Sequence, residues 1–124
     1  MSPSIIELLG PTIVLLASIA VAWWGIACRA GRFPRNLVLG YRTRAALSSR
    51  DAWDAAHRGY APFLIGGGLL LAASGVAAII MVLTDATGLV GPAITAGIIT
   101  LLAALTVGGL FAHRALRRHL TQTG

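Results

Sequence analysis

The sequence has few charged residues and no lysine. Of its 124 residues, 11% are charged and 56% are hydrophobic, whereas an ordinary soluble domain carries about 25% charged residues. Ten arginines and four acidic residues give a net charge of +6. Because a soluble domain of this length would need more polar surface, the composition excludes a soluble enzyme. It predicts a small integral membrane protein with a single domain over residues 1–124.

Charge is absent from three long stretches, at residues 8–28, 59–84 and 86–112. About 20 helical residues cross a bilayer, and the stretches lack the alternation of barrel strands. We therefore predict an all-α integral membrane protein with three transmembrane helices, because helices satisfy every backbone group inside lipid. The expected segments are helices at about 8–28, 61–84 and 90–112, a loop at 29–60 and a tail at 113–124.

The arginines lie in two of the segments outside these helices. Seven are in the loop at 29–60 and three follow His113, whereas the other two connections carry only Glu7 and Asp85. By the positive-inside rule, the loop and the C-terminus are expected to be cytoplasmic and the N-terminus outside. The first apolar stretch lacks the positive segment of a secretory signal, so we expect an uncleaved anchor.

The sequence pI of about 11.4 raises the question of nucleic-acid binding. No interleaving of aromatic and basic residues and no recognition helix accompanies the charge, so we expect no nucleic-acid partner. The forked guanidinium of arginine suits phosphate groups. The lipid bilayer and its anionic phospholipid headgroups are therefore expected partners.

Small residues recur at helical spacing along the apolar stretches, and such rows let helices approach closely in lipid. We predict helix contacts along them. No Asp, Glu, Lys or Arg occurs within the stretches, which argues against an ion-coupled transporter. The rows are Ser18, Ala22 and Gly25, then Gly68, Ala72 and Gly75, then Ala96, Thr100, Ala104, Gly108 and Ala112.

The loop contains start and stop signals for helices. Gly31 is expected to end the first helix. Ser48 followed by Asp51 is a capping-box pattern, which predicts a second helix at about 49–60. We interpret it as a short interfacial amphipathic helix that leads into the second span, with a bend at Pro62.

The faces of this short helix differ in character. Trp53, His57 and Tyr60 share one face, where the two aromatic residues are expected to be interface anchors. His57 is expected to form a hydrogen bond within the loop. Asp54 and Arg58 lie on another face and are expected to pair at i, i+4.

The loop carries a set of residues with specific spacing: Asn36, Gly40, Tyr41, Arg42, Thr43, Ser48, Trp53, His57 and Arg58. In these residues it resembles the signature loop of the SdpI family, whose members are three-helix membrane units. Members are associated with immunity to a secreted peptide toxin and with signalling that the toxin has been bound. The resemblance implies a bacterial plasma-membrane protein with a partner-binding or lipid-binding site in the loop, although Arg44 stands where the family often has proline.

Two interpretations of the arginines around Thr43 remain open. Arg42 and Arg44 could hold a phosphate group in a glycine-led turn. Alternatively, they could form an internal salt bridge to Asp51 or Asp54 that fastens the loop to the short helix.

The chain offers no recognisable set of catalytic residues. No base or oxyanion hole accompanies the serines of the loop, so we expect no enzymatic activity. The single cysteine, Cys28, and the three histidines lack the short spacing of a metal site. We therefore expect no metal and no cofactor.

These observations favour a non-enzymatic membrane binding module of the SdpI type. It would act on a peptide toxin, a regulator or lipid through its Arg-rich cytoplasmic loop. The alternative is an accessory subunit of a larger membrane complex, such as a transporter or a respiratory or cell-envelope enzyme. The rows of small residues motivate that alternative, because three thin helices bury little surface on their own.

Overall fold

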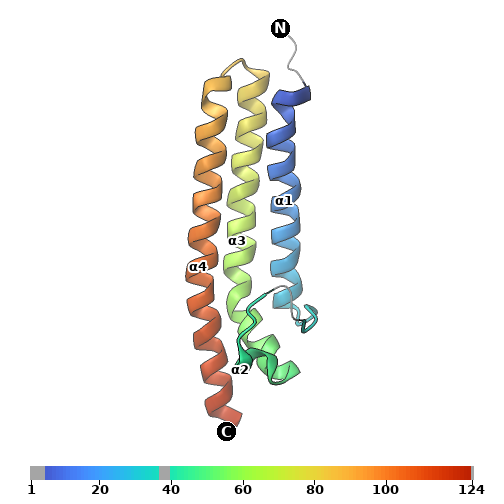
Figure 1. The fold of residues 1–124 in the computed structure, drawn as a ribbon, viewed down its shortest axis with the longest axis vertical. Helices are drawn as coiled ribbons and strands as arrows, with labels where there is room; N and C mark the ends of the chain where they lie inside the picture. The colour runs from blue at the N-terminus through green and yellow to red at the C-terminus, as the bar shows by residue number, and fades with distance from the viewer. Residues whose placement is uncertain (1–4, 37–39, 124) are drawn as a thin grey trace.

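Three long helices run side by side in the computed structural model, which describes residues 5–36 and 40–123 (Figure 1). Residues 1–4, which we expect outside the cell, do not belong to the described part. The tail predicted at 113–124 is helical as far as residue 123 and continues the third long helix. The elements are α1 (Ile5–Arg29), α2 (Arg44–Leu47), α3 (Arg50–Leu83), the 3-10 turn η1 (Thr87–Leu89) and α4 (Val90–Thr123).

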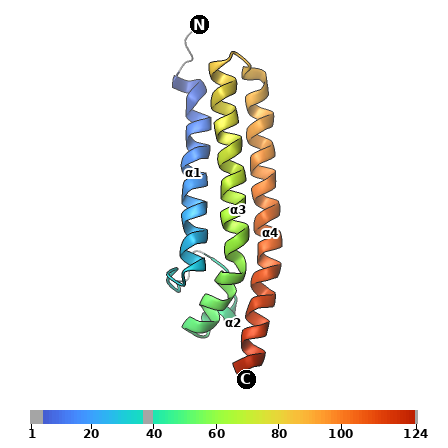
Figure 2. The same ribbon diagram turned by 180° about the vertical axis from the view of Figure 1, so that it is seen from behind.

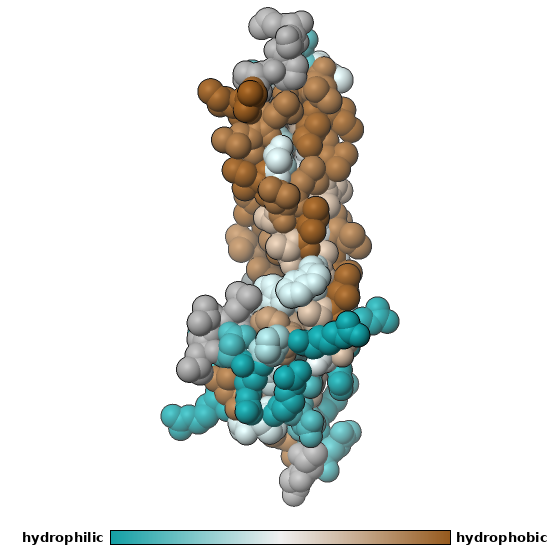
Figure 3. All heavy atoms as spheres, turned by 90° about the vertical axis from the view of Figure 1, so that its right-hand side faces the viewer, coloured by the Kyte–Doolittle hydropathy of each residue, from teal (hydrophilic) through white to brown (hydrophobic). Residues whose placement is uncertain are grey.

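The helices have the length and surface of membrane spans. All three are long and apolar enough to cross a bilayer, which confirms the predicted fold class. Large apolar side chains such as Ile19, Leu69 and Ile99 are exposed on them. Hydrophobic residues cover most of the length of the molecule, and hydrophilic residues gather at the end that holds the loop (Figure 3). The chain is therefore a multi-pass membrane protein.

α3 is the central helix, with α1 on one side and α4 on the other (Figures 1 and 2). The small-residue rows predicted for the first two spans meet where α1 contacts α3. A Cβ on Gly68 would lie 2.9 Å from the Ala22 nitrogen and 3.1 Å from the Ser18 oxygen. A Cβ on Gly25 would lie 2.8 Å from the Ile65 nitrogen. The two backbones thus approach as closely as glycine allows.

Only part of the predicted row on α4 lies against α3. A strict four-residue period advances about 40° beyond a full turn at each step, so the row leaves the contact face. In the first turns of α4, Gly97 lies against α3 in place of Ala96 and Thr100, and it contacts Ser74. The Ser74 hydroxyl donates a hydrogen bond to the Ala93 carbonyl (2.6 Å). The exposed members are Ala96 and Thr100, and those turned toward α3 are Ala104, Gly108 and Ala112.

α3 joins the predicted loop helix and the second span in one continuous helix. Its N-cap is Ser49, whose hydroxyl accepts a hydrogen bond from the Ala52 N–H (3.0 Å). The helix therefore begins close to the predicted position, but with the second serine rather than Ser48 as its cap. Ser48 instead follows α2 as its C-cap.

The helix continues through Pro62. Proline lacks an N–H, so the Arg58 carbonyl receives no helical hydrogen bond there, which favours a bend. The first turns of α3 lean beneath the end of α1 (Figures 1 and 2). These turns, residues 50–58, carry charge and lie with the loop, whereas residues 59–83 form the apolar part that we expect to cross the membrane.

Candidate functional site

α1 ends in a turn that sends the chain back against the first turns of α3. The Gly31 N–H donates to the Cys28 carbonyl (3.3 Å), and the Arg32 N–H donates to the Ala27 carbonyl (2.9 Å). This pattern is a Schellman motif, which places a residue in the left-handed region. Gly31 has φ 70° and fills that position, as the sequence predicted.

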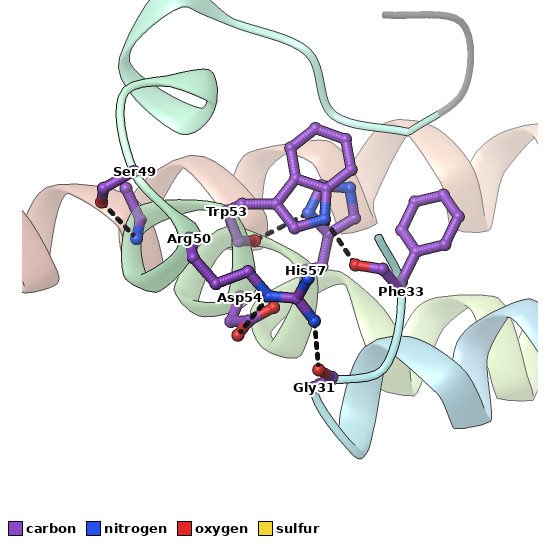
Figure 4. Close-up of polar contacts among 8 residues, drawn as sticks. Gly31, Phe33, Ser49, Arg50, Trp53, Asp54 and His57 are labelled. Carbon is purple, nitrogen blue, oxygen red and sulfur yellow. Dashed lines mark hydrogen bonds and ion pairs between the residues drawn. The ribbon is translucent and has the colours of Figure 1, made fainter. Parts of the chain in front are cut away.

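The turn delivers Phe33 to the base of α3, against Trp53. The two rings stack with centroids 5.6 Å apart, and the Trp53 indole N–H donates to the Phe33 carbonyl at 2.8 Å (Figure 4). Trp53 is 0% exposed, so its prediction as an interface anchor is wrong. Because the carbonyl satisfies the indole N–H, the ring can be buried in protein instead of reaching the bilayer surface.

His57 lies one turn further along α3 and holds the returning loop. Its Nδ1 is 2.8 Å from the Trp53 carbonyl, and its Nε2 is 3.0 Å from the backbone nitrogen of Tyr41. Since a carbonyl only accepts and an N–H only donates, Nδ1 carries the proton and Nε2 accepts. The imidazole is therefore neutral and in one defined tautomer, and its expected hydrogen bond within the loop is present.

The burial of His57 opposes its protonation. The residue is 1% exposed and precedes the membrane-crossing part of α3. Burial lowers the pKa of His57 below its ordinary value of 6.5, against smaller upward effects of the Trp53 carbonyl and of Asp54. A proton on Nε2 would also face the Tyr41 N–H, so protonation and the loop contact are incompatible.

Gly40 permits the hydrogen bond between the Tyr41 N–H and His57 in two ways. Its φ is 107°, a conformation that side chains disfavour. A Cβ there would lie 2.6 Å from Nε2 of His57 and 2.8 Å from the ring of Phe33. The next residue, Tyr41, links the loop to α4, because its hydroxyl is 3.1 Å from Nδ1 of His113.

An arginine fastens the first turn of α3 to the end of α1. The Arg50 guanidinium donates to the Gly31 carbonyl (2.8 Å) and lies 3.3 Å from the Asp54 carboxylate (Figure 4). The sequence left open whether Arg42 or Arg44 forms such a link to Asp51 or Asp54, and in the structure Arg50 pairs with Asp54. Asp54 was predicted to pair with Arg58, but it pairs with Arg50, one turn earlier on the helix. The Arg50 guanidinium is favoured because the Gly31 carbonyl gives it a second acceptor.

Other motif residues shape the surface of the loop. The Thr43 hydroxyl caps α2 by accepting from the Ala46 N–H (3.2 Å), and Arg42 is exposed. The Asn36 side chain donates to the Pro34 carbonyl (2.9 Å). A surface cavity of about 420 Å³ opens beside it; we call it the loop cavity. Its lining residues are Arg35, Asn36, Leu47 and Ser48.

The structure thus separates the nine motif residues into three places. One group forms the buried contact, a second surrounds the loop surface, and Arg58 lies apart beside Gly31. The first group is the buried Trp53 and His57 with the half-buried Gly40 and Tyr41, and the surface group is Asn36, Arg42, Thr43 and Ser48.

Three further residues support this arrangement without having been singled out from the sequence: Phe33, Arg50 and His113. Phe33 could have been found from the sequence, since it is the one aromatic residue among residues 29–40, which also hold three arginines. Such a residue needs a place to be buried. The other two residues resemble their neighbours in sequence, and only the folded chain shows their contacts.

The titratable side chains of the described residues are spread along the chain. In the ranges 5–36 and 40–123, no three His, Cys, Asp or Glu side chains are grouped so that they could hold an ion. Cys28 is free and 1% exposed, in a cluster with Phe33 and Trp53. It packs there as a small apolar side chain.

Comparison with known proteins identifies the family. No curated protein and no solved structure matches the chain. The model of the SdpI/YfhL protein family matches residues 32–113, which extend from the loop through α3 into α4. These residues include every motif position and make up more than half of the sequence. The chain therefore belongs to the SdpI/YfhL protein family.

Proposed function

We propose that this chain is a non-enzymatic binding module of the SdpI type in the bacterial plasma membrane. Its arginine-rich loop would face the cytoplasm and bind a peptide toxin or a regulator. The observation that carries this proposal is the attachment of the loop to all three long helices. Arg50 donates a hydrogen bond to the Gly31 carbonyl, just after the end of α1. His57 of α3 accepts a hydrogen bond from the Tyr41 N–H, and the Tyr41 hydroxyl is hydrogen-bonded to His113 of α4.

This attachment supports a binding role because it holds the surface residues in defined positions. The His57 and Trp53 hydrogen bonds are buried or partly buried, and breaking such bonds leaves polar groups unsatisfied. A surface that is ordered before binding loses less conformational entropy when a partner arrives. The loop cavity, which Arg35 lines, and the exposed Arg42 would offer donors to acidic or carbonyl groups of that partner.

The proposal is tested by removing one positive charge at the loop surface. Arg42→Gln is compared with Arg117→Gln, which removes the same charge from the exposed tail of α4. Both variants are expressed at equal levels in the native host, and proteins that co-purify from its membranes are quantified. We expect Arg42→Gln to lose a partner that Arg117→Gln retains. Equal recovery of every partner would show that the loop is not the binding surface.

The accessory-subunit alternative is supported by the outer faces of the helices. Leu16 and Ile19 on α1, and Leu102 and Leu110 on α4, are more than half exposed. Either lipid or helices of a larger complex could cover them. Solubilisation in a gentle detergent distinguishes the two functions, because recovery of the chain only as a monomer or homo-oligomer would contradict a host complex.

A further inference from the structure

A second cavity lies away from the loop cavity, where the end of α1 meets the bend of α3. Its volume is about 540 Å³, which is larger than the loop cavity. We call it the arginine groove. It opens at the boundary between the charged end of the molecule and the apolar part of the helices. Its lining residues are Arg29, Arg58, Ala61, Pro62, Ile65 and Gly66.

Two guanidinium groups form the polar end of the arginine groove. Arg29 is the last residue of α1, and Arg58 precedes the apolar part of α3. The Arg58 Nη2 lies 3.2 Å from where a Cβ on Gly31 would be. The absence of a side chain at Gly31 therefore leaves room for this guanidinium against the turn.

The positive charge around these two residues is only partly balanced. One carboxylate, that of Asp54, lies at the same turn: the Cβ position of Gly31 is 3.2 Å from the Arg58 Nη2 and 3.8 Å from the Asp54 Oδ2. This carboxylate is paired with Arg50. Within the part of the chain that the structure describes, no salt bridge joins Arg29 or Arg58 to a carboxylate. The polar end of the groove therefore keeps a net positive charge.

The other end of the groove is apolar. Pro62 is exposed and Ile65 is half-buried, and nothing lies within 4 Å of a Cβ placed on Gly66. This floor continues along α3 in the direction of the membrane-crossing residues. A ligand that fills the groove must therefore carry an anionic group at one end and an apolar chain at the other.

We propose that the arginine groove binds one anionic phospholipid. Its phosphate lies between Arg29 and Arg58, where two guanidinium forks match the phosphate oxygens. Its acyl chain covers Ile65 and Gly66. An anionic headgroup is preferred over a zwitterionic one, because the cation of a choline headgroup would be repelled by the net positive charge of the groove. This proposal requires only that the groove lie at the bilayer surface and does not depend on what the loop binds.

The proposal is tested by native mass spectrometry of the purified full chain in detergent, with phosphatidylglycerol or phosphatidylcholine added. The double variant Arg29→Gln, Arg58→Gln is compared with Arg117→Gln, Arg118→Gln, which loses the same charge from the tail of α4. We expect the wild type and the tail variant to retain one phosphatidylglycerol several-fold more than phosphatidylcholine. The groove variant should lose about ten-fold in phosphatidylglycerol retention. Equal retention by the two double variants, or equal binding of both lipids, would overturn the assignment.

Two further measurements separate the headgroup from the acyl chain. Gly66→Leu fills the apolar floor without changing charge, and Gly109→Leu adds the same side chain where nothing lies within 4 Å of the Cβ position on α4. We expect only Gly66→Leu to reduce phosphatidylglycerol retention several-fold, and this comparison serves even if the arginine variant fails to fold. Millimolar inorganic phosphate should leave the lipid bound. Displacement by phosphate would instead identify a site for a free anion and contradict the lipid assignment.

Discussion

Trp53 and His57 are buried through hydrogen bonds with the chain that returns from α1. The indole N–H and the imidazole Nε2 each meet a backbone group of the loop, at 2.8 Å and 3.0 Å. Each contact is worth about 0.5–1.5 kcal/mol, and an unsatisfied buried partner costs about 1–3 kcal/mol. At the scale of single residues, these motif positions therefore act by holding the loop, and a partner would meet their neighbours on its surface.

Gly40→Ala tests the tightest point of this contact. The added Cβ would meet both His57 and Phe33 and would impose a side chain at φ 107°, so we expect a loss of about 1–3 kcal/mol in stability. Gly88→Ala is the matched control, because nothing lies within 4 Å of its Cβ position. Thermal unfolding in detergent should show a lower midpoint for the first variant only. Equal midpoints would mean that the loop does not pack on His57.

The stability of the protein should depend on pH through His57. Because the folded-state pKa of His57 is lowered from 6.5, the unfolded chain binds a proton first as pH falls. The contribution of His57 to stability is therefore complete above pH 6.5 and is lost progressively below it. The total loss is about 1.4 kcal/mol for each unit by which the folded-state pKa lies below 6.5. Unfolding midpoints measured from pH 7.5 to 5 should fall more steeply for the wild type than for His57→Gln. Parallel curves would refute this assignment, since the other two histidines are present in both proteins.

At the scale of elements, the length of each apolar stretch was sufficient to predict the helices, and the rows of small residues predicted one helix contact well. The α4 row was partly wrong because a four-residue period departs from the 3.6-residue turn over several steps. The position of Gly97 against Ser74 depends on the pitch of the helix and on its neighbour. A repeat counted along the sequence does not contain that information.

Gly68→Leu tests the contact between α1 and α3. Its Cβ would lie 2.9 Å from the Ala22 backbone nitrogen, so the helices must separate, at a cost of about 1–3 kcal/mol from overpacking. Gly109→Leu introduces the same side chain into open space and should leave stability nearly unchanged. The midpoint of thermal unfolding in detergent measures both variants. If both had the wild-type midpoint, the close approach of α1 and α3 would be contradicted.

At the scale of the whole molecule, the number of spans follows from hydropathy alone, because lipid leaves few choices of backbone structure. The candidate site was predictable as a segment but not as a geometry. Trp53 has the sequence environment of an interface anchor, and it is buried where Phe33 packs against the first turns of α3. The turn at Gly31 that starts this return was predictable from the sequence. The contacts that hold the returning chain join residues 16 to 20 positions apart, and no local pattern encodes them.

The orientation of the whole chain is the remaining prediction, and it follows from the distribution of charge. Ten arginines and two aspartates give the loop end a net charge of +8, whereas the opposite end carries Glu7 and Asp85. The positive-inside rule then places the loop and the end of α4 in the cytoplasm. In a Cys28→Ala background, Gly88→Cys and Gln122→Cys each place a single thiol at one end of the molecule. A membrane-impermeant maleimide should label Gly88→Cys in intact cells and Gln122→Cys only after permeabilisation, and the reverse pattern would show that the loop lies outside.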